Sequence, residues 1–106
     1  MVNPYRGEVG LILNGEARNM RLTLGALAEL EASLEAESLV DLIDRFESGA
    51  FRAGDLVALI LASLHGAGNG ISREEFLAAE IEGGPVEAAR KAAELLRVTF
   101  SLPEVE

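Results

Sequence analysis

An Asn-Gly pair near the start of the chain, Asn14 and Gly15, restricts the fold more than any other feature. Both residue types tolerate the positive φ angles that the type I′ turn of a two-residue β-hairpin requires. Val9, Leu11 and Leu13 alternate before the pair, and Met20 and Leu22 alternate with Asn19 and Arg21 in a return strand over 17–22. A two-residue period on both sides of such a turn predicts an antiparallel hairpin over about residues 7–22.

The rest of the chain predicts short helices, because its apolar residues recur at spacings of three and four. We expect five of them, over about residues 24–35, 39–48, 56–65, 73–82 and 85–101. Residues that favour helix starts precede or open four of these segments: Thr23, Ser38, Asp55 and Ser72, the last with Glu75 as a capping box. The third segment is apolar on nearly all sides, so we expect it at the centre of the domain. In the first, Leu24, Leu27 and Leu30 are expected to face the core.

The length and composition predict one α+β domain, residues 1–106, with an N-terminal β-hairpin packed on about five short α-helices. The 106 residues are 49% hydrophobic and mostly aliphatic, which favours a mainly helical core. An isolated two-stranded hairpin is marginal in water, so this one must pack on the helices or meet another strand. An open edge could accept a partner strand or a second copy of the chain, or the helices could cover it. The sequence leaves these alternatives open, and with them the oligomeric state.

The charge of the chain limits its partners. Acidic residues outnumber basic ones by 18 to 9, which gives a net charge of −9. Such a surface repels a phosphate backbone, so direct nucleic-acid binding is not expected. A net charge this far from zero keeps a small domain dispersed in solution. The alternative explanation is that the acidic surface binds a basic partner. The chain has no secretory start and no apolar run of about 20 residues, so we expect a cytoplasmic protein with no membrane partner.

No motif indicates catalysis, a cofactor or a metal site. The chain has no cysteine, and its one histidine, His65, has no nucleophile or second ligand at a useful spacing. The glycine-rich segment 66–70 follows a predicted helix rather than a strand and lacks a phosphate-binding signature, so a helix end and turn explain it better. Pairs of carboxylates lie on the polar faces of predicted helices. We therefore expect a protein that is not an enzyme.

Several segments, read in order, resemble a known family. They are Arg-Gly-Glu-Val at 6–9, Leu-Thr-Leu-Gly-Ala-Leu-Ala-Glu-Leu-Glu at 22–31, Leu-His-Gly-Ala-Gly at 64–68 and the capping box at 72–75. This pattern resembles the tail-assembly protein family of gene transfer agents and siphophages, whose members are described as tail tube proteins or tail assembly chaperones. The resemblance covers nearly the whole chain and concerns structural motifs rather than catalytic ones.

The resemblance implies a role in virion assembly through protein–protein interaction. The implied partner is the tape-measure protein, the tail tube subunit, or both, with the chain acting as a chaperone. Tape-measure proteins are long helical chains whose apolar stripes would aggregate unless they are covered. An apolar groove between helices of this protein could cover them. The alternative within the family is a structural tail tube component that stays in the particle tail.

Two sets of residues are candidates for partner binding, because they are the least needed for folding. The first set is expected on the outer face of the hairpin: Arg6, Glu8, Arg18 and Arg21. The second set, Phe51 and Arg52, lies in the short link between the second and third helices. Phe51 has a competing interpretation as a core residue.

The segment 37–43 also resembles the modification site of acyl carrier proteins, where a serine at a helix start carries phosphopantetheine. The match has departures, since Glu37 replaces an aspartate and Asp41 lies one position early. A leading hairpin is also foreign to that fold. Ser38 as an ordinary helix N-cap is the favoured interpretation, and an acyl-carrier-like protein modified at Ser38 is a remote alternative.

Overall fold

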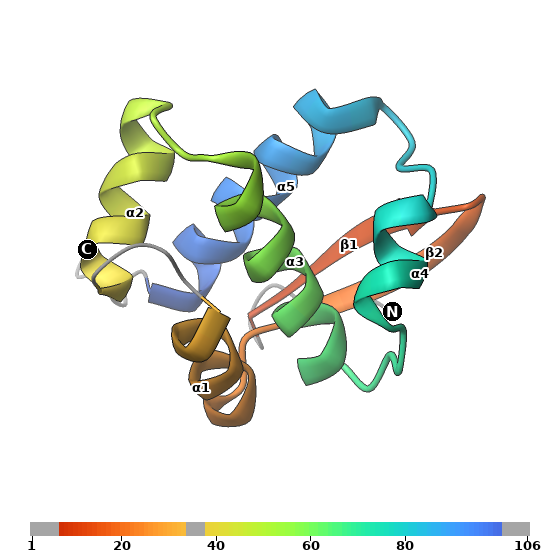
Figure 1. Cartoon of the computed structure of the whole chain (residues 1–106), viewed down its shortest axis with the longest axis horizontal. Coiled ribbons are helices and arrows are strands. Elements are labelled where there is room, and N and C mark those ends of the chain that lie inside the picture. The colour runs from red at the N-terminus through yellow and green to blue at the C-terminus, as the bar shows by residue number, and fades with distance from the viewer. Residues whose placement is uncertain (1–6, 34–37, 101–106) are drawn as a thin grey trace, which may run out of the picture.

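The computed structural model describes residues 7–33 and 38–100 and has an α+β fold that is mainly helical, as predicted (Figure 1). Two strands are followed by five helices: β1 (Glu8–Leu13), β2 (Glu16–Arg21), α1 (Leu24–Ser33), α2 (Leu39–Ser48), α3 (Ala53–Gly66), α4 (Arg73–Ala78) and α5 (Gly84–Phe100). The last residues of the first and fifth predicted helices, beyond 33 and 100, lie outside the described residues.

The predicted hairpin is confirmed. β1 pairs antiparallel with β2, and Leu13 lies opposite Glu16 across the two-residue turn. Asn14 and Gly15 have φ angles of 51° and 80°, as a type I′ turn requires. The alternation buries one face of the sheet, formed by Val9, Leu11, Leu13 and Met20.

Helix α3 is the central element, as its composition predicted. Residues 58–64 are all buried, and α3 contacts α1, α4, α5 and β2. In Figure 1 it crosses the middle of the molecule, with the hairpin on one side and α2 on the other. The core is aliphatic, with Leu59, Ile60 and Leu64 fully buried.

Helix α3 begins at Ala53 rather than near residue 56, so Asp55 does not precede the helix as an N-cap. Instead Asp55 lies in the first turn, and its Oδ2 accepts a hydrogen bond from the Arg52 backbone N–H at 3.0 Å. The same oxygen accepts a hydrogen bond from Arg45 at 3.0 Å. The aspartate therefore satisfies the helix start from inside the first turn, which lengthens the helix toward its N-terminus.

Helix α4 is shorter than predicted, ending at Ala78 instead of near residue 82. After it the chain becomes extended, and Ile81 forms an antiparallel bridge with Leu13. The Asn14 N–H donates to the Glu80 carbonyl at 2.8 Å, and the Glu82 N–H donates to the Ile12 carbonyl at 3.1 Å. Pairing with the end of β1 thus replaces the last helical turn that the local pattern indicates.

Helix α1 buries two of its three predicted core residues, Leu30 fully and Leu27 in part, but not Leu24. Thr23 caps it, since its hydroxyl accepts the Ala26 N–H at 3.1 Å, but Leu24 is 86% exposed. The buried positions are Ala26 and Leu30, four residues apart, with Leu27 partly buried beside them. Contact with α3 decides which side of this helix is buried.

The turn after α3 covers the outer edge of β2. The Asn69 side-chain amide donates to the Asn19 carbonyl at 2.9 Å and to the Leu64 carbonyl at 3.2 Å. Gly66 packs so closely against the Arg21 carbonyl that a Cβ there would lie 2.1 Å from its oxygen. One of the two edges of the hairpin is therefore closed by the fold itself.

Candidate interaction surfaces

The predicted outer-face residues of the hairpin do not form one surface. Glu8 and Arg21 are opposite each other at the open end of the hairpin. Arg18 lies opposite the buried Leu11, so it is on the inner face, and its predicted place on the outer face was wrong. The two-residue period puts residue 18 on the side of Met20, and its guanidinium reaches Glu16 at 2.9 Å and Asn69 at 3.3 Å. Arg6 lies outside the described residues.

The two predicted residues between α2 and α3 belong to the connection of these helices. The Phe51 ring stacks on Phe46, with centroids 4.5 Å apart and planes 4° apart, and is partly buried against the core. Arg52 is the N-cap of α3. The structure therefore does not bring this pair together with the hairpin residues, and Phe51 has a packing role.

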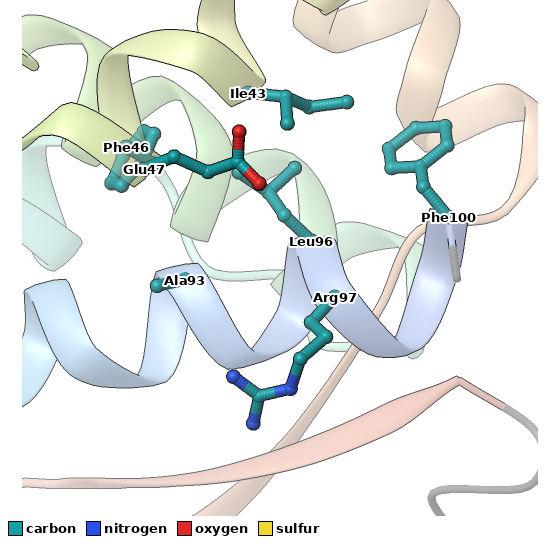
Figure 2. Close-up of a pocket in the computed structure, with 7 residues that line it drawn as sticks. All are labelled: Ile43, Phe46, Glu47, Ala93, Leu96, Arg97 and Phe100. Carbon is teal, nitrogen blue, oxygen red and sulfur yellow. The ribbon is translucent and has the colours of Figure 1, made fainter.

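An apolar groove, whose residues were not predicted from the sequence, lies between α2 and α5 (Figure 2). Its volume is about 460 Å³, within the range of ligand-binding clefts. In Figure 2, Leu96 and Phe100 project from α5 toward α2, and Ile43 extends from α2 above them. The residues that line this apolar groove are Ile43, Phe46, Glu47, Ala93, Leu96, Arg97 and Phe100.

The groove exists because α5 is apolar on more of its circumference than the core covers. Four residues of α5 are buried in the core: Ala88, Ala92, Leu95 and Leu96. A second stripe, one position later, shares Leu96 with the core and continues through Ala93 and Phe100, which line the groove and are more exposed, Phe100 to 38%. Two adjacent apolar stripes on the predicted helix were visible in the sequence, and their combined width was a signal for a second contact surface.

An ion-pair network holds α2, the other wall of the apolar groove. The Arg45 guanidinium lies 3.0 Å from Asp55 Oδ2 and 3.5 Å from Asp41 Oδ2. The Asp55 side chain is fully buried, so Arg45 is the partner that offsets the cost of burying its charge. Ser38 and Gly49 bound the helix: the Ser38 hydroxyl accepts the Asp41 N–H at 3.1 Å, as the N-cap interpretation expected.

A second groove lies on the other side of α5, along the outer edge of β1. It has a volume of about 440 Å³, and its polar lining is mostly acidic. The residues that line this edge groove are 8–12 of β1, Ala17, Glu82, and Glu87, Lys91 and Glu94 of α5. A side-chain hydrogen bond from Arg90, at 2.8 Å, holds the pKa of Glu87 below its usual range.

His65 joins three segments rather than forming a reactive pair. Its Nδ1 lies 2.8 Å from Glu29 Oε2, and its Nε2 lies 2.7 Å from the Ile71 carbonyl oxygen. Both partners accept hydrogen bonds, so both ring nitrogens donate when the imidazole is protonated. The Ile71 carbonyl, and secondarily Glu29, raise the pKa of His65 against the opposing effect of burial. This contact ties α1 to the end of α3.

The described residues contain no group of three or more histidines and carboxylates arranged to hold a metal ion. Within the same ranges, 7–33 and 38–100, no helix has the length and apolarity that crossing a membrane requires. Besides the two grooves beside α5, the described residues form two further hollows, one between α3, α4 and the start of α5 and one near the ends of β2 and α5.

Comparison with known proteins gives the family of the chain. No curated protein and no solved structure is significantly similar to the chain. A family model described as "phage tail tube protein, GTA-gp10" matches residues 6–102, nearly the whole chain. It is a family of phage tail proteins rather than of enzymes. The chain therefore belongs to the GTA-gp10 phage tail tube protein family and is related to the tails of phages and gene transfer agents.

Proposed function

We propose that this protein is a tail assembly chaperone that covers an apolar helical segment of the tape-measure protein during assembly. The observation that carries the proposal is the apolar groove between α2 and α5. An amphipathic helix binds such a groove through side chains spaced three and four residues apart. Ala93 and Phe100 offer apolar contacts two helical turns apart along one wall, with the buried Leu96 between them, and Ile43 offers one from the other wall.

The polar rim of the groove supports a helical occupant. Glu47 lies on the α2 side and Arg97 on the α5 side, and both are exposed. A bound amphipathic helix would place its apolar stripe between them and its flanking polar residues against these charges. The net charge of −9 would then keep the complex of chaperone and client dispersed.

Co-expression with the tape-measure protein tests this proposal. We expect the protein to co-purify with the tape-measure protein and to raise its soluble fraction. The double variant Ile43→Ser/Phe100→Ser should lose both effects, because truncating groove residues of this kind costs on the order of 2 kcal/mol of binding energy. Ile43 is half-buried and Phe100 is at the end of α5, so thermal unfolding should show a folded variant.

The matched control is Val40→Ser/Val86→Ser. It changes one exposed apolar residue on each of the same two helices, 67% and 81% exposed, and neither lines the groove. This control should bind like the unmodified protein. Loss of binding in both double variants would contradict the assignment of the interface to the groove.

The content of purified particles separates the chaperone from a structural role. A chaperone should be absent from finished particles when they are analysed by quantitative mass spectrometry. Many copies per particle would make the protein a structural tail tube component and would overturn the chaperone proposal.

A further inference from the structure

The outer edge of β1 is paired with a neighbouring segment at only one of its ends. Residues 80–82 pair with the turn end of β1 through the bridge between Leu13 and Ile81. The chain then leaves the edge in a turn, in which the Gly84 N–H donates to the Ile81 carbonyl at 2.9 Å. Gly83 has a φ of +88°, and a Cβ there would lie 2.6 Å from the Cβ of Glu87. This turn sends the chain into α5 after a single bridge.

The register identifies which backbone groups remain on that edge. Leu13 and Glu16 flank the two-residue turn, so they form a hydrogen-bonded pair, and the pairs alternate from there. Ile12 and Gly10 therefore direct their backbone groups away from β2. The bond from Glu82 to the Ile12 carbonyl confirms this direction. The described part of the chain offers no hydrogen-bond partner to the Ile12 N–H or to the Gly10 N–H and carbonyl.

The charged residues of the edge groove determine which partner side chains this strand edge would favour. Its carboxylates come from β1, from the segment before α5 and from α5 itself: Glu8, Glu82, Glu87 and Glu94. Lys91 is its one basic residue among those described, and it lies 4.0 Å from Glu87. Among the described residues no ion pair involves Glu82 or Glu94, although the charge of Arg90, the partner of Glu87, also acts on Glu94. An added strand would therefore lie between acidic walls.

We propose that the edge groove binds an extended, lysine- or arginine-bearing segment of a partner protein as an added β-strand next to β1. The ladder begun by residues 80–82 sets its position, and the backbone groups of Gly10 and Ile12 supply its hydrogen bonds. A second copy of this chain fits less well, because pairing β1 with β1 would bring two acidic grooves and two net charges of −9 together. This site is on the opposite side of α5 from the apolar groove, and it does not depend on the chaperone proposal.

Amide hydrogen exchange of the free protein, followed by NMR, gives the first test. The amides of Val9 and Leu11 should be protected by β2, whereas those of Gly10 and Ile12 should exchange close to the rates of unstructured peptides. Protection of Gly10 and Ile12 in the protein alone would mean that the edge is already covered, and the proposal would be wrong.

A designed peptide gives the second test. The probe is a blocked heptapeptide of alternating valine and lysine, and its control has glutamate in place of lysine. We expect the lysine peptide to slow exchange at Gly10 and Ile12 by at least about tenfold at saturation, since each would gain a strand hydrogen bond. A lysine peptide methylated on alternate backbone nitrogens should not do so. Binding without new protection at these two amides would overturn the strand proposal.

Charge variants separate the groove from general attraction between a basic peptide and an acidic protein. Glu82→Lys/Glu94→Lys should weaken binding of the lysine peptide at least about tenfold. The control Glu31→Lys/Asp44→Lys makes the same change in net charge at exposed positions outside both grooves. It should change the affinity less than about threefold, and equal weakening by both variants would contradict a specific site.

Discussion

The two grooves of this protein share α5 as a wall but are built from opposite chemistry. On one side, Leu96 and Phe100 face α2, and the surface suits apolar side chains of a helix. On the other, Glu87 and Glu94 face the edge of β1, and the surface suits a basic strand. The difference shows that a single helix can present two chemically distinct surfaces when its buried stripe is narrow and its flanks differ.

The two grooves also differ in the contacts that fix their walls. α2 contacts few other elements, and Arg45 and Phe46 connect it to the start of α3. The β1 edge is fixed by the whole hairpin and by the bridge to Ile81. We therefore expect the apolar groove to be the more deformable of the two surfaces.

The largest effect should come from removing the support of α2. Arg45→Ala leaves the buried Asp55 carboxylate without its ion-pair partner, and we expect a loss of about 3 kcal/mol in unfolding free energy. Urea denaturation measures this loss, and amide exchange should rise more in α2 than in β1. Arg90→Ala, which removes an exposed ion pair with Glu87, should change the unfolding free energy little. An equal loss in both variants would contradict the role of Arg45.

The second prediction tests whether the grooves act independently. Ile43→Ser/Phe100→Ser should weaken binding of an amphipathic tape-measure peptide by about 30-fold and leave binding of the lysine peptide unchanged. Glu82→Lys/Glu94→Lys should do the reverse. Isothermal titration calorimetry with each peptide and each variant measures the four affinities. If either variant weakened both peptides equally, the two grooves would be one coupled surface.

The third prediction uses salt to distinguish the grooves without mutation. Raising the ionic strength from about 0.05 M to 0.5 M screens exposed charges, so the lysine peptide should bind several-fold more weakly. Binding in the apolar groove should change less than about twofold, because burial of apolar surface supplies most of its energy. The same titrations, repeated at both salt concentrations, check this. Equal salt dependence would argue against the chemical contrast between the sites.

The smallest effect concerns His65, which lines neither groove. Its pKa is raised in the folded state, so the contact with Ile71 and Glu29 stabilises the fold fully below about pH 6.5 and is lost as the pH rises through the folded pKa. We expect stability to fall by about 0.5 kcal/mol between about pH 6 and pH 9, the scale of a partly exposed pair. Denaturation curves at several pH values measure this. His65→Gln should remove that pH dependence, and an unchanged slope would contradict the assignment.

Much of the fold was predictable because its signals are local. The pair Asn14 and Gly15 fixed a turn that determines the strand register, and Ser38 and Gly49 bounded α2 at the residues observed. The alternation in β1 predicted its buried face. Each of these signals acts within a few residues through φ angles or hydrogen bonds to nearby backbone groups, so no knowledge of the tertiary structure is needed.

The elements that were predicted less well depend on contacts distant in sequence. The end of α4 was predicted too late, because a bridge between Leu13 and Ile81 draws the chain out of the helix. The buried side of α1 depends on its contact with α3, which leaves Leu24 exposed. Arg18 differs: the two-residue period already placed it with Met20, and applying that period strictly would have put it on the inner face.

By itself, the sequence determined the hairpin, the number of helices, the central place of α3 and the order of motifs shared with the phage tail family. Only the tertiary structure decided where the two grooves lie. A helical stripe specifies which residues can be buried, but whether another element covers it depends on packing. α2 covers the stripe of Leu96 and Phe100 only in part, and the turn at Gly83 stops the strand that would close the β1 edge.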